Sequence, residues 1–339
     1  MRIIAGKFKG RTLDGGPDRS IRPTTDRVKE SMFNLIQGRT EGAAVLDLFA
    51  GSGALGIEAL SRGADSVTFC DRQPSSVAVL RKNLQKVDGN LRILQRDWRA
   101  SLAEFGRAGD RFDLIFLDPP YDVIEPADLL SEIVDRKVLK EDGLIVFERP
   151  RGGKPPVFPA GTGLIDSRDY GATTLDLIGF VSKVAVTGTF DPFTKGHLEI
   201  VREACRAFDE VHVVVLVNPD KKTWLSPEKR IQVIEAAVKT LKRRITVAYS
   251  EGLAIDYCKA HDIGYIMRGV RNENDFAYEK EMAEWNLKHG GIKTLFVQTD
   301  LPEISSTAVR EALAKGEGVG EYLVPQTIKL ITEGAEWKT

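Results

Sequence analysis

The chain has 339 residues, with 48 Lys and Arg against 49 Asp and Glu, and a formal net charge of −1 at pH 7. This length favours two domains, each long enough to bury a core of its own. The near-neutral balance excludes a protein that is strongly basic throughout. The 3 cysteines are far apart, which excludes a disulfide framework and a zinc site of the usual spacing. We expect Cys205 and Cys258, which fall in helix-like apolar patterns, to be buried thiols.

The sequence also bears on where the protein works. The first residues lack the apolar stretch of a signal peptide, and no apolar run approaches the length of a membrane span. We therefore expect a soluble, cytoplasmic protein with no membrane partner.

The first half alternates short apolar runs with helical patterns, which is typical of βα units around a mostly parallel sheet. Either Thr24 or Thr25 can cap a first helix, whose apolar face would include Val28, Met32 and Leu35. The strands are then expected at 44–49, 66–71, 91–95, 112–118 and 143–148. The runs 164–170 and 173–181 predict an antiparallel hairpin that closes the sheet.

A glycine loop follows the first expected strand. Gly51-Ser52-Gly53-Ala54-Leu55-Gly56 has the spacing G-x-G-x-x-G, and Asp71 comes twenty residues after the first glycine. Such a turn lets the backbone approach a cofactor, and the carboxylate can accept hydrogen bonds from ribose hydroxyls. Both NAD and S-adenosylmethionine need these features, so the loop alone leaves the cofactor open.

The tetrapeptide Asp118-Pro119-Pro120-Tyr121 favours methyl transfer to an amine. It ends the fourth expected strand, at the edge of the sheet where α/β proteins bind ligands. The Asp118 carboxylate and a proline carbonyl can hold an exocyclic NH2 group, and Tyr121 offers a surface for stacking a base. Asp97, after the third strand, could accept a hydrogen bond from an adenine amino group, although a lone Asp is as often a surface residue.

The first 39 residues are rich in Lys and Arg, with nine against four Asp and Glu. Such a cluster suits a phosphate-facing surface, but a solvated basic face has the same composition.

The segments Met1–Arg11, Arg22–Glu30, Leu46–Gly53 and Asp118–Tyr121 resemble the bacterial small-subunit ribosomal RNA guanine-N2 methyltransferases over roughly residues 1–180. The resemblance implies methylation of a guanine amine in 16S rRNA or a 30S particle, with S-adenosylmethionine as cofactor. The family more often has Glu where this chain has Asp71, and Asp can do the same work. The implied catalytic residues are Asp118, Pro119, Pro120 and Tyr121; the cofactor residues are Gly51, Ser52, Gly53, Asp71 and Asp97; the RNA residues are Arg2, Lys7, Lys9, Arg11 and Arg22.

The second half begins without a Pro-rich, Gly/Ser-rich or charged linker. Its expected strands are 184–187, 211–217, 245–249, 265–268 and 294–299. Ser226-Pro227-Glu228 predicts a helix start, with a cap, a proline at the first position and an acid in the first turn. The apolar residues Ile231, Ile234, Val238 and Leu241 follow at helical spacing.

A second set of motifs suits nucleotidyl transfer. The segment Thr187–His197 joins a strand to a helix, and His197 at the helix start can donate to a phosphoryl oxygen. Lys221 and Arg268 follow later strands at the same edge, and Ile304-Ser305-Ser306-Thr307 begins another helix. Cations and helix ends that converge in this way neutralise and position phosphates.

Residues 182–339 resemble phosphopantetheine adenylyltransferase, which transfers AMP from ATP to 4′-phosphopantetheine with Mg²⁺. The resemblance implies that Thr189 orients the attacking phosphate and that His197 stabilises the transition state. Thr194 stands where related enzymes have the first His of HxGH. The implied ATP residues are Thr189, Phe190, His197, Gly269, Val270, Arg271, Glu279, Ile304, Ser305, Ser306 and Thr307; the phosphopantetheine residues are Thr189, Lys221, Ala254 and Arg268.

We therefore predict an α/β protein of two Rossmann-like domains: a class I S-adenosylmethionine-dependent methyltransferase sheet over 1–181, followed by an HxGH-type nucleotidyltransferase parallel sheet over 182–339. The predicted function is bifunctional. One alternative keeps an active adenylyltransferase with a non-catalytic, RNA-binding or scaffolding first half. Another makes the second half a cytidylyltransferase, which the stretch 268–279 opposes. The adenylyltransferase family commonly forms hexamers, so a homo-oligomer is also expected, and no metal-ligating residue is predicted.

Overall fold

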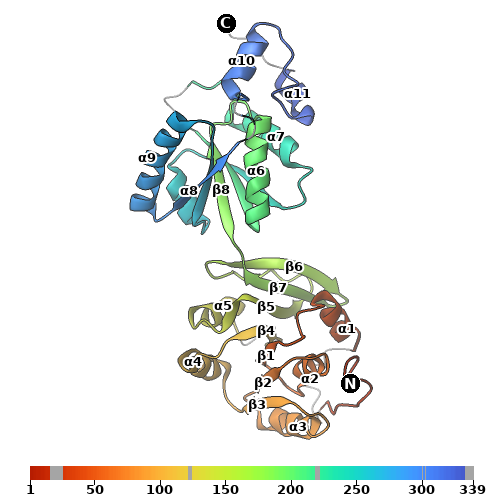
Figure 1. The fold of residues 1–339 in the computed structure, drawn as a ribbon. Helices are drawn as coiled ribbons and strands as arrows, with labels where there is room; N and C mark the ends of the chain where they lie inside the picture. Colours follow the sequence, from red (N-terminus) through yellow and green to blue (C-terminus); the bar gives the residue numbers. More distant parts are fainter. Residues whose placement is uncertain (16–25, 121–123, 218–221, 300, 302, 333–339) are drawn as a thin grey trace. The chain divides into compact units, whose positions relative to one another are not determined.

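The two sheets that the alternating pattern predicts are both present in the computed structural model (Figure 1). The structure describes all residues except 16–25, 121–123, 218–221, 300, 302 and 333–339. The chain divides into two compact units, Met1–Phe180 and Val181–Thr339, here called unit 1 and unit 2. No helix within the described ranges is long and apolar enough to cross a membrane.

Unit 1 is built on a seven-stranded sheet of order β3-β2-β1-β4-β5-β7-β6. The strands from β3 to β5 pair in parallel, whereas β7 pairs antiparallel with both β5 and β6. The strands are β1 (Ala44–Asp47), β2 (Ser66–Cys70), β3 (Asn90–Leu94), β4 (Phe112–Leu117), β5 (Leu139–Pro150), β6 (Thr162–Tyr170) and β7 (Thr173–Phe180). The helices are α1 (Asp26–Leu35), α2 (Ala54–Ser61), α3 (Pro74–Leu84), α4 (Trp98–Ala108) and α5 (Pro126–Asp135).

Alternate residues of the central strands feed two apolar clusters on opposite faces of this sheet. Val45, Leu114 and Phe116 belong to a cluster with residues of α1, α2 and α3. Leu46 and Ile115 belong to a cluster with residues of α4 and α5. Figure 1 shows the same division, with α1, α2 and α3 on one side of the sheet and α4 and α5 on the other. Both faces of the sheet are covered, which explains the nearly continuous apolar run in β4.

Two elements of unit 1 differ from the expected pattern. Strand β5 begins at Leu139 rather than at 143, because Leu139 pairs with Phe112 before the register of the two strands shifts. The intervening charged residues 140–142 hide this first part from an apolar pattern. Helix α1 buries Lys29 beside Met32 and Phe33, whereas Val28 and Leu35 are only partly buried. Thr24 and Thr25, the expected caps, lie outside the described residues.

Unit 2 has a five-stranded parallel sheet of order β10-β9-β8-β11-β12. Its strands are β8 (Lys183–Gly188), β9 (Glu210–Leu216), β10 (Arg244–Ser250), β11 (Tyr265–Val270) and β12 (Lys293–Gln298). Its helices are α6 (Lys195–Ala207), α7 (Pro227–Val238), α8 (Ala254–Ala260), α9 (Glu273–Gly290), α10 (Ser306–Ala314) and α11 (Pro325–Thr332). Apolar clusters again lie on both faces, one with α6, α7, α10 and α11 and the other with α8. Cys205 and Cys258 are buried free thiols, as is Cys70 in unit 1.

Candidate active sites

The glycine loop of unit 1 connects β1 to α2 and is held by Asp71. Gly51 and Gly53 have φ angles of 53° and 81°, in the left-handed region that favours glycine. Asp71, directly after β2, accepts from the N–H of Gly51 through Oδ2 at 2.9 Å and from Gln73 through Oδ1 at 2.8 Å. The Ser52 carbonyl accepts from the Nδ2 of Asn83 at 2.9 Å. The structure thus brings the predicted loop and Asp71 together at one edge of the sheet.

Asp118 follows β4 at this same edge and is half-buried, and Pro119 beside it is buried. Pro120 is exposed, and Tyr121 lies outside the described residues. Asp97, which we predicted to bind the cofactor, follows β3. Its carboxylate caps α4 by accepting from the Arg99 N–H at 2.9 Å. The fold therefore places the acids that follow β2, β3 and β4 along one edge of parallel strands.

Asp47 is a residue of this site to which sequence reasoning assigned no role. It ends β1, is 3% exposed, and accepts from the Gly56 N–H at 3.0 Å. Burial raises the pKa of its carboxyl to about 7, and the charges of Asp118 and Asp71 act in the same direction. A carboxylate inside the apolar run Leu46–Phe49 was the signal that could have found it.

The amino-terminal segment of unit 1 is folded onto α2. The Glu58 carboxylate accepts from the N–H groups of Ile4 and Ala5 at 2.8 and 3.0 Å. Glu58 is fully buried and forms an ion pair of 3.3 Å with the buried Lys29. Since a buried charge without a partner is costly, these two groups depend on each other and hold the segment in place.

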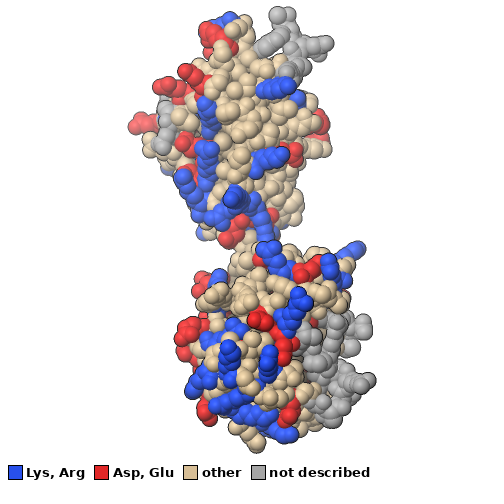
Figure 2. Space-filling model, turned by 90° about the vertical axis from the view of Figure 1, so that its right-hand side faces the viewer, with Lys and Arg blue, Asp and Glu red and all other residues tan. Residues whose placement is uncertain are grey.

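The predicted RNA-binding side chains stand around this anchored segment. Arg2, Lys7, Lys9 and Arg11 are all exposed. Phe8 between them is buried, and the charged ends of Lys7 and Arg11 lie 5.1 and 4.8 Å from the centre of its ring. Figure 2 shows Lys and Arg side chains on the surface of unit 1, with Asp and Glu side chains among them. Arg22, the fifth predicted RNA residue, lies outside the described residues.

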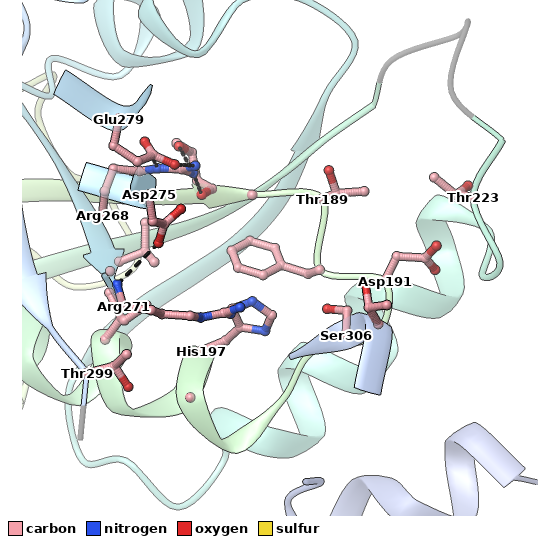
Figure 3. Close-up of a pocket in the computed structure, with 18 of the residues that line it drawn as sticks. Thr189, Asp191, His197, Thr223, Arg268, Arg271, Asp275, Glu279, Thr299 and Ser306 are labelled. Atoms are coloured by element: carbon pink, nitrogen blue, oxygen red, sulfur yellow. Dashed lines mark hydrogen bonds and ion pairs between the residues drawn. The ribbon is translucent and has the colours of Figure 1, made fainter. Parts of the chain in front are cut away.

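In unit 2, a cavity of about 580 Å³ opens among the carboxyl end of β8, the end of β11 and the start of α10 (Figure 3). Its lining includes the predicted residues Thr189, Phe190, His197, Arg268, Gly269, Arg271, Glu279, Ser306 and Thr307. Sequence reasoning missed other residues of the lining, among them Asp191, Thr223, Asp275, Thr299 and Arg310. Most of the predicted nucleotide site is therefore brought together in one cavity.

Four predicted residues do not line this cavity: Val270, Ala254, Ile304 and Ser305. Ser305 caps α10, and its hydroxyl accepts from the Ala308 N–H at 3.0 Å. Ala254 begins α8, which packs on the opposite face of the sheet from α6. Lys221 lies outside the described residues.

His197 is held as a neutral donor at the start of α6. Thr194 caps this helix, and its backbone N–H donates to the His197 Nδ1 at 3.0 Å. Because Nδ1 accepts, a neutral ring carries its proton on Nε2. Burial lowers the pKa of His197 to about 3, with further lowering by the charges of Arg271 and Arg268. The ring is therefore neutral at physiological pH and can donate through Nε2.

Arginines and acids form the wall beside His197. Arg268 is bound by Glu279 through two nitrogens and by the Thr187 carbonyl. The backbone N–H of Arg271 donates to the Asp275 carboxylate at 3.2 Å. Figure 3 shows the Arg271 side chain extending beside the imidazole of His197. The predicted phosphate ligand Arg268 and the predicted ATP ligand Glu279 are thus partners of each other.

Asp191 shapes the opposite wall of the cavity. Its carboxylate accepts from the N–H groups of Trp224 and Leu225 at 2.7 and 2.8 Å. The Pro192 carbonyl accepts from the Ser306 hydroxyl at 2.8 Å. These bonds fasten the loop between β8 and α6 to both the chain before α7 and the start of α10.

Comparisons with known proteins divide the chain in the same way. A family model described as conserved hypothetical protein 95 matches residues 1–179, and one described as cytidylyltransferase-like matches residues 185–312. The Bacillus subtilis protein YlbH is provisionally named an rRNA methyltransferase. It is 39% identical over 175 residues, covering 51% of this chain and 95% of that protein. The phosphopantetheine adenylyltransferase of Phocaeicola vulgatus is 42% identical over 145 residues, covering 42% of this chain and 95% of that protein. The solved structure of yhhF from Escherichia coli, provisionally titled a methyltransferase, is 33% identical, with a TM-score of 0.48 and coverage of 52% of this chain and 96% of that one.

Proposed function

Since this chain belongs over its first half to the family of conserved hypothetical protein 95, and over its second half to the phosphopantetheine adenylyltransferases, we propose that it is a bifunctional transferase. Unit 2 transfers AMP from ATP to 4′-phosphopantetheine, and unit 1 methylates the N2 amine of a guanine in 16S rRNA. The observation that carries the proposal is the presence of a formed site at the carboxyl edge of each sheet. The site of unit 1 contains the acid Asp118, and the site of unit 2 contains His197.

In adenylyl transfer, a phosphate oxygen of 4′-phosphopantetheine attacks the α-phosphorus of ATP. A new P–O bond forms, the bond to the β-phosphate breaks, and pyrophosphate leaves. The neutral His197 donates its Nε2 proton in a hydrogen bond to an oxygen of the α-phosphate, where negative charge grows. Thr189, on the loop after β8, orients the attacking phosphate. Arg271, Ser306 and Thr307 line the same cavity and hold the ATP phosphates.

Magnesium enters this scheme with the phosphates of ATP. The described residues contain no group of three or more His, Cys, Asp or Glu that could hold a metal ion. The triphosphate and water would supply the oxygen ligands that Mg²⁺ prefers.

In methyl transfer, the task of unit 1 is to hold the amine and the cofactor in line. The Asp118 carboxylate and a proline carbonyl accept from the two N–H groups of the guanine amine, which leaves the nitrogen lone pair directed at the methyl group. S-adenosylmethionine would supply that electrophilic methyl when bound: the N–CH3 bond would form as the S–CH3 bond breaks, and S-adenosylhomocysteine would leave. The amine proton would pass to the Asp118 carboxylate, which already accepts from it. The Asp71 carboxylate fits the cofactor ribose, because each of its oxygens accepts one backbone N–H and keeps a second lone pair.

RNA binding is assigned to the anchored amino-terminal segment. Its four described basic side chains, Arg2, Lys7, Lys9 and Arg11, are exposed, as phosphate contacts require. The fold of this segment on α2 gives those side chains a set position.

Self-association is assigned to unit 2. Helix α9 carries five large apolar side chains that are exposed: Phe276, Tyr278, Met282, Trp285 and Leu287. Large exposed apolar side chains are often found at interaction sites. We assign α9 to contacts between copies of the chain, in a hexamer; a light-scattering mass equal to one chain would contradict that assignment.

The two activities are tested together with matched variants. The unaltered chain should release pyrophosphate from ATP with 4′-phosphopantetheine, and it should transfer label from S-adenosylmethionine to undermethylated 30S particles. Asp118→Asn should abolish only the methyl transfer, and His197→Ala should lower only the pyrophosphate release, by about 100-fold or more. Equal activity with CTP in place of ATP would contradict the adenylyl assignment. Absence of methyl transfer while pyrophosphate release proceeds would leave unit 1 without catalytic function.

A further inference from the structure

The turn Thr189–Asp191 links β8 to the start of α6 and has an unusual conformation. Phe190 has a φ of 49°, which residues other than glycine rarely adopt. Its ring is buried and meets the imidazole of His197 edge-on, with ring centres 5.1 Å apart. A turn of this shape has to be held by its surroundings.

One of the groups that hold the turn is a buried arginine on α7. Arg230 is 1% exposed, and one terminal guanidinium nitrogen donates to the Thr189 carbonyl at 2.8 Å. The position belongs to the inner face of α7, with Val233, Ile234 and Ala237. The apolar spacing of that helix predicts no charge there.

Packing alone does not explain why this buried position holds an arginine, because the hydrogen bonding of its guanidinium is incomplete. Among the described residues, no hydrogen-bond partner is found for its buried Nε. Burial lowers the pKa of the guanidinium, and the charges of Asp191 and Glu228 only oppose that effect. Burying a charged group with incomplete hydrogen bonding is costly, and an apolar side chain at this position would avoid the cost.

The contact with Thr189 determines the orientation of two groups of the cavity. A bond to the Thr189 carbonyl fixes the peptide plane between Thr189 and Phe190. That plane sets where the Thr189 side chain points and where the Phe190 ring lies against His197. Arg230 itself is not among the residues that line the cavity. It can therefore act on the reaction only through these neighbours.

We propose that Arg230 is a positioning residue for adenylyl transfer, which holds the Thr189–Asp191 turn so that Thr189 and His197 meet the reacting phosphates in line. This role rests on the proposed adenylyl transfer in unit 2. The residues proposed to hold the ATP phosphates, Arg271, Ser306 and Thr307, lie outside this turn, so loss of the contact should impair turnover and leave ATP binding intact. A change of about an ångström in the position of reacting groups can cost on the order of 100-fold in rate.

The test compares Arg230→Met, which keeps the volume and removes the donor, with Arg230→Lys, which keeps the charge and one donor group. Gln232→Met, at an exposed position of the same helix, is the matched control. For each full-length variant, thermal unfolding, the ATP dissociation constant, and kcat and KM for pyrophosphate release with 4′-phosphopantetheine are measured.

The proposal expects kcat of Arg230→Met to fall at least 10-fold while the ATP dissociation constant stays within twofold. Arg230→Lys should lie between it and the unaltered chain, and Gln232→Met should match the unaltered chain. If the Met variant does not fold, the Lys variant is judged alone, with an expected threefold to tenfold fall in kcat. Unchanged kcat in a folded Met variant, or an ATP affinity that falls in proportion to kcat, would overturn the role. If the unaltered chain itself releases no pyrophosphate, the proposed function fails together with this inference.

Discussion

Glu279 binds the guanidinium of Arg268 with both carboxylate oxygens, one of them at 2.8 Å from Nε. Arg268 comes from β11, and Glu279 lies two turns into α9. Glu279 is 7% exposed and Arg268 is half-buried, so the pair is partly shielded from solvent at the cavity wall. Bidentate pairs of this kind fix the direction of an arginine as well as its charge. Arg268 therefore has a set orientation before any phosphate arrives.

We expect Glu279→Gln to raise the KM for 4′-phosphopantetheine about 10-fold and the KM for ATP less than threefold. The amide leaves the half-buried guanidinium without its countercharge, so Arg268 no longer holds one orientation. Steady-state kinetics with each substrate varied in turn measure both constants. Glu281→Gln, an exposed change on the same helix, is the control. A variant whose KM rises for ATP alone would show that Glu279 binds the nucleotide directly.

Because the pKa of His197 is about 3, we expect this group to cause no change in kcat with pH near neutrality. Between pH 5 and 9 the imidazole stays neutral, so its Nε2–H remains a donor and kcat shows no ionisation that belongs to His197. Nitrogen chemical shifts of the imidazole over this range provide the measurement, with His197→Ala assigning the signal. A His197 titration centred between pH 6 and 7 would contradict the neutral-donor role.

The same shift has a consequence for stability in acid. The folded pKa lies below the ordinary value of 6.5, so the unfolded chain binds the proton more readily. Above pH 6.5 the ionisation of His197 does not affect the free energy of unfolding. Below pH 6.5 the unfolded chain takes up the proton first, so the free energy of unfolding decreases as the pH falls. His197→Asn should therefore lose less stability than the unaltered chain between pH 7 and pH 5, as measured by denaturant unfolding.

Asp47 should act with the opposite dependence in unit 1. Its folded pKa of about 7 exceeds the ordinary 3.8, so between these values the folded chain keeps a proton that the unfolded chain has lost. The free energy of unfolding therefore decreases as the pH rises from 4 to 7, by on the order of 3 kcal/mol, and levels off above. Asp47→Asn removes the ionisation and keeps an acceptor for the Gly56 N–H. The unfolding free energies of the two proteins should change differently with pH between pH 4 and pH 7, and parallel changes would count against the raised pKa.

The docking of the amino-terminal segment can be tested with a matched pair of glycines. Gly6 and Gly10 have similar φ angles of 82° and 87°. A Cβ at Gly6 would lie 1.7 Å from the Ser61 carbonyl oxygen, whereas a Cβ at Gly10 meets nothing within 4 Å. Both Ala variants incur backbone strain of roughly 1–2 kcal/mol, and only Gly6→Ala also displaces the segment from α2.

We expect Gly6→Ala to weaken binding to a 16S rRNA fragment at least 10-fold, with a shallower dependence on salt, while Gly10→Ala stays within threefold. Binding titrations at several salt concentrations measure both quantities. Equal losses in the two variants would mean that the docked position of the segment has no part in RNA binding.

Local patterns were enough to predict most of the architecture. Apolar runs predicted the parallel strands, because a strand covered on both faces leaves a continuous signal in the sequence. The glycine loop, the acid after β4 and the histidine at the start of α6 were found for a similar reason. Each depends on a turn directly after a strand, and the residues of such a turn are neighbours in the chain.

The state of those residues depends on contacts that the sequence does not reveal. Three examples follow from how strands and helices pack: the pairing of Arg268 with Glu279, the burial of Asp47, and the hydrogen bond from Arg230 to the Thr189 carbonyl. Residues 41 positions apart meet in the last case. Free energies of burial and ion pairing arise only when such distant groups share a low-dielectric site.

The sequence by itself therefore determined which two chemistries the chain carries, since both motif sets are short and contiguous. Only the tertiary structure decided which ionisable groups are buried, which nitrogen of His197 is left to donate, and which side chains contact the residues of the two proposed sites. Ionisation and orientation depend on neighbours in space, and the order of residues along the chain does not specify those neighbours.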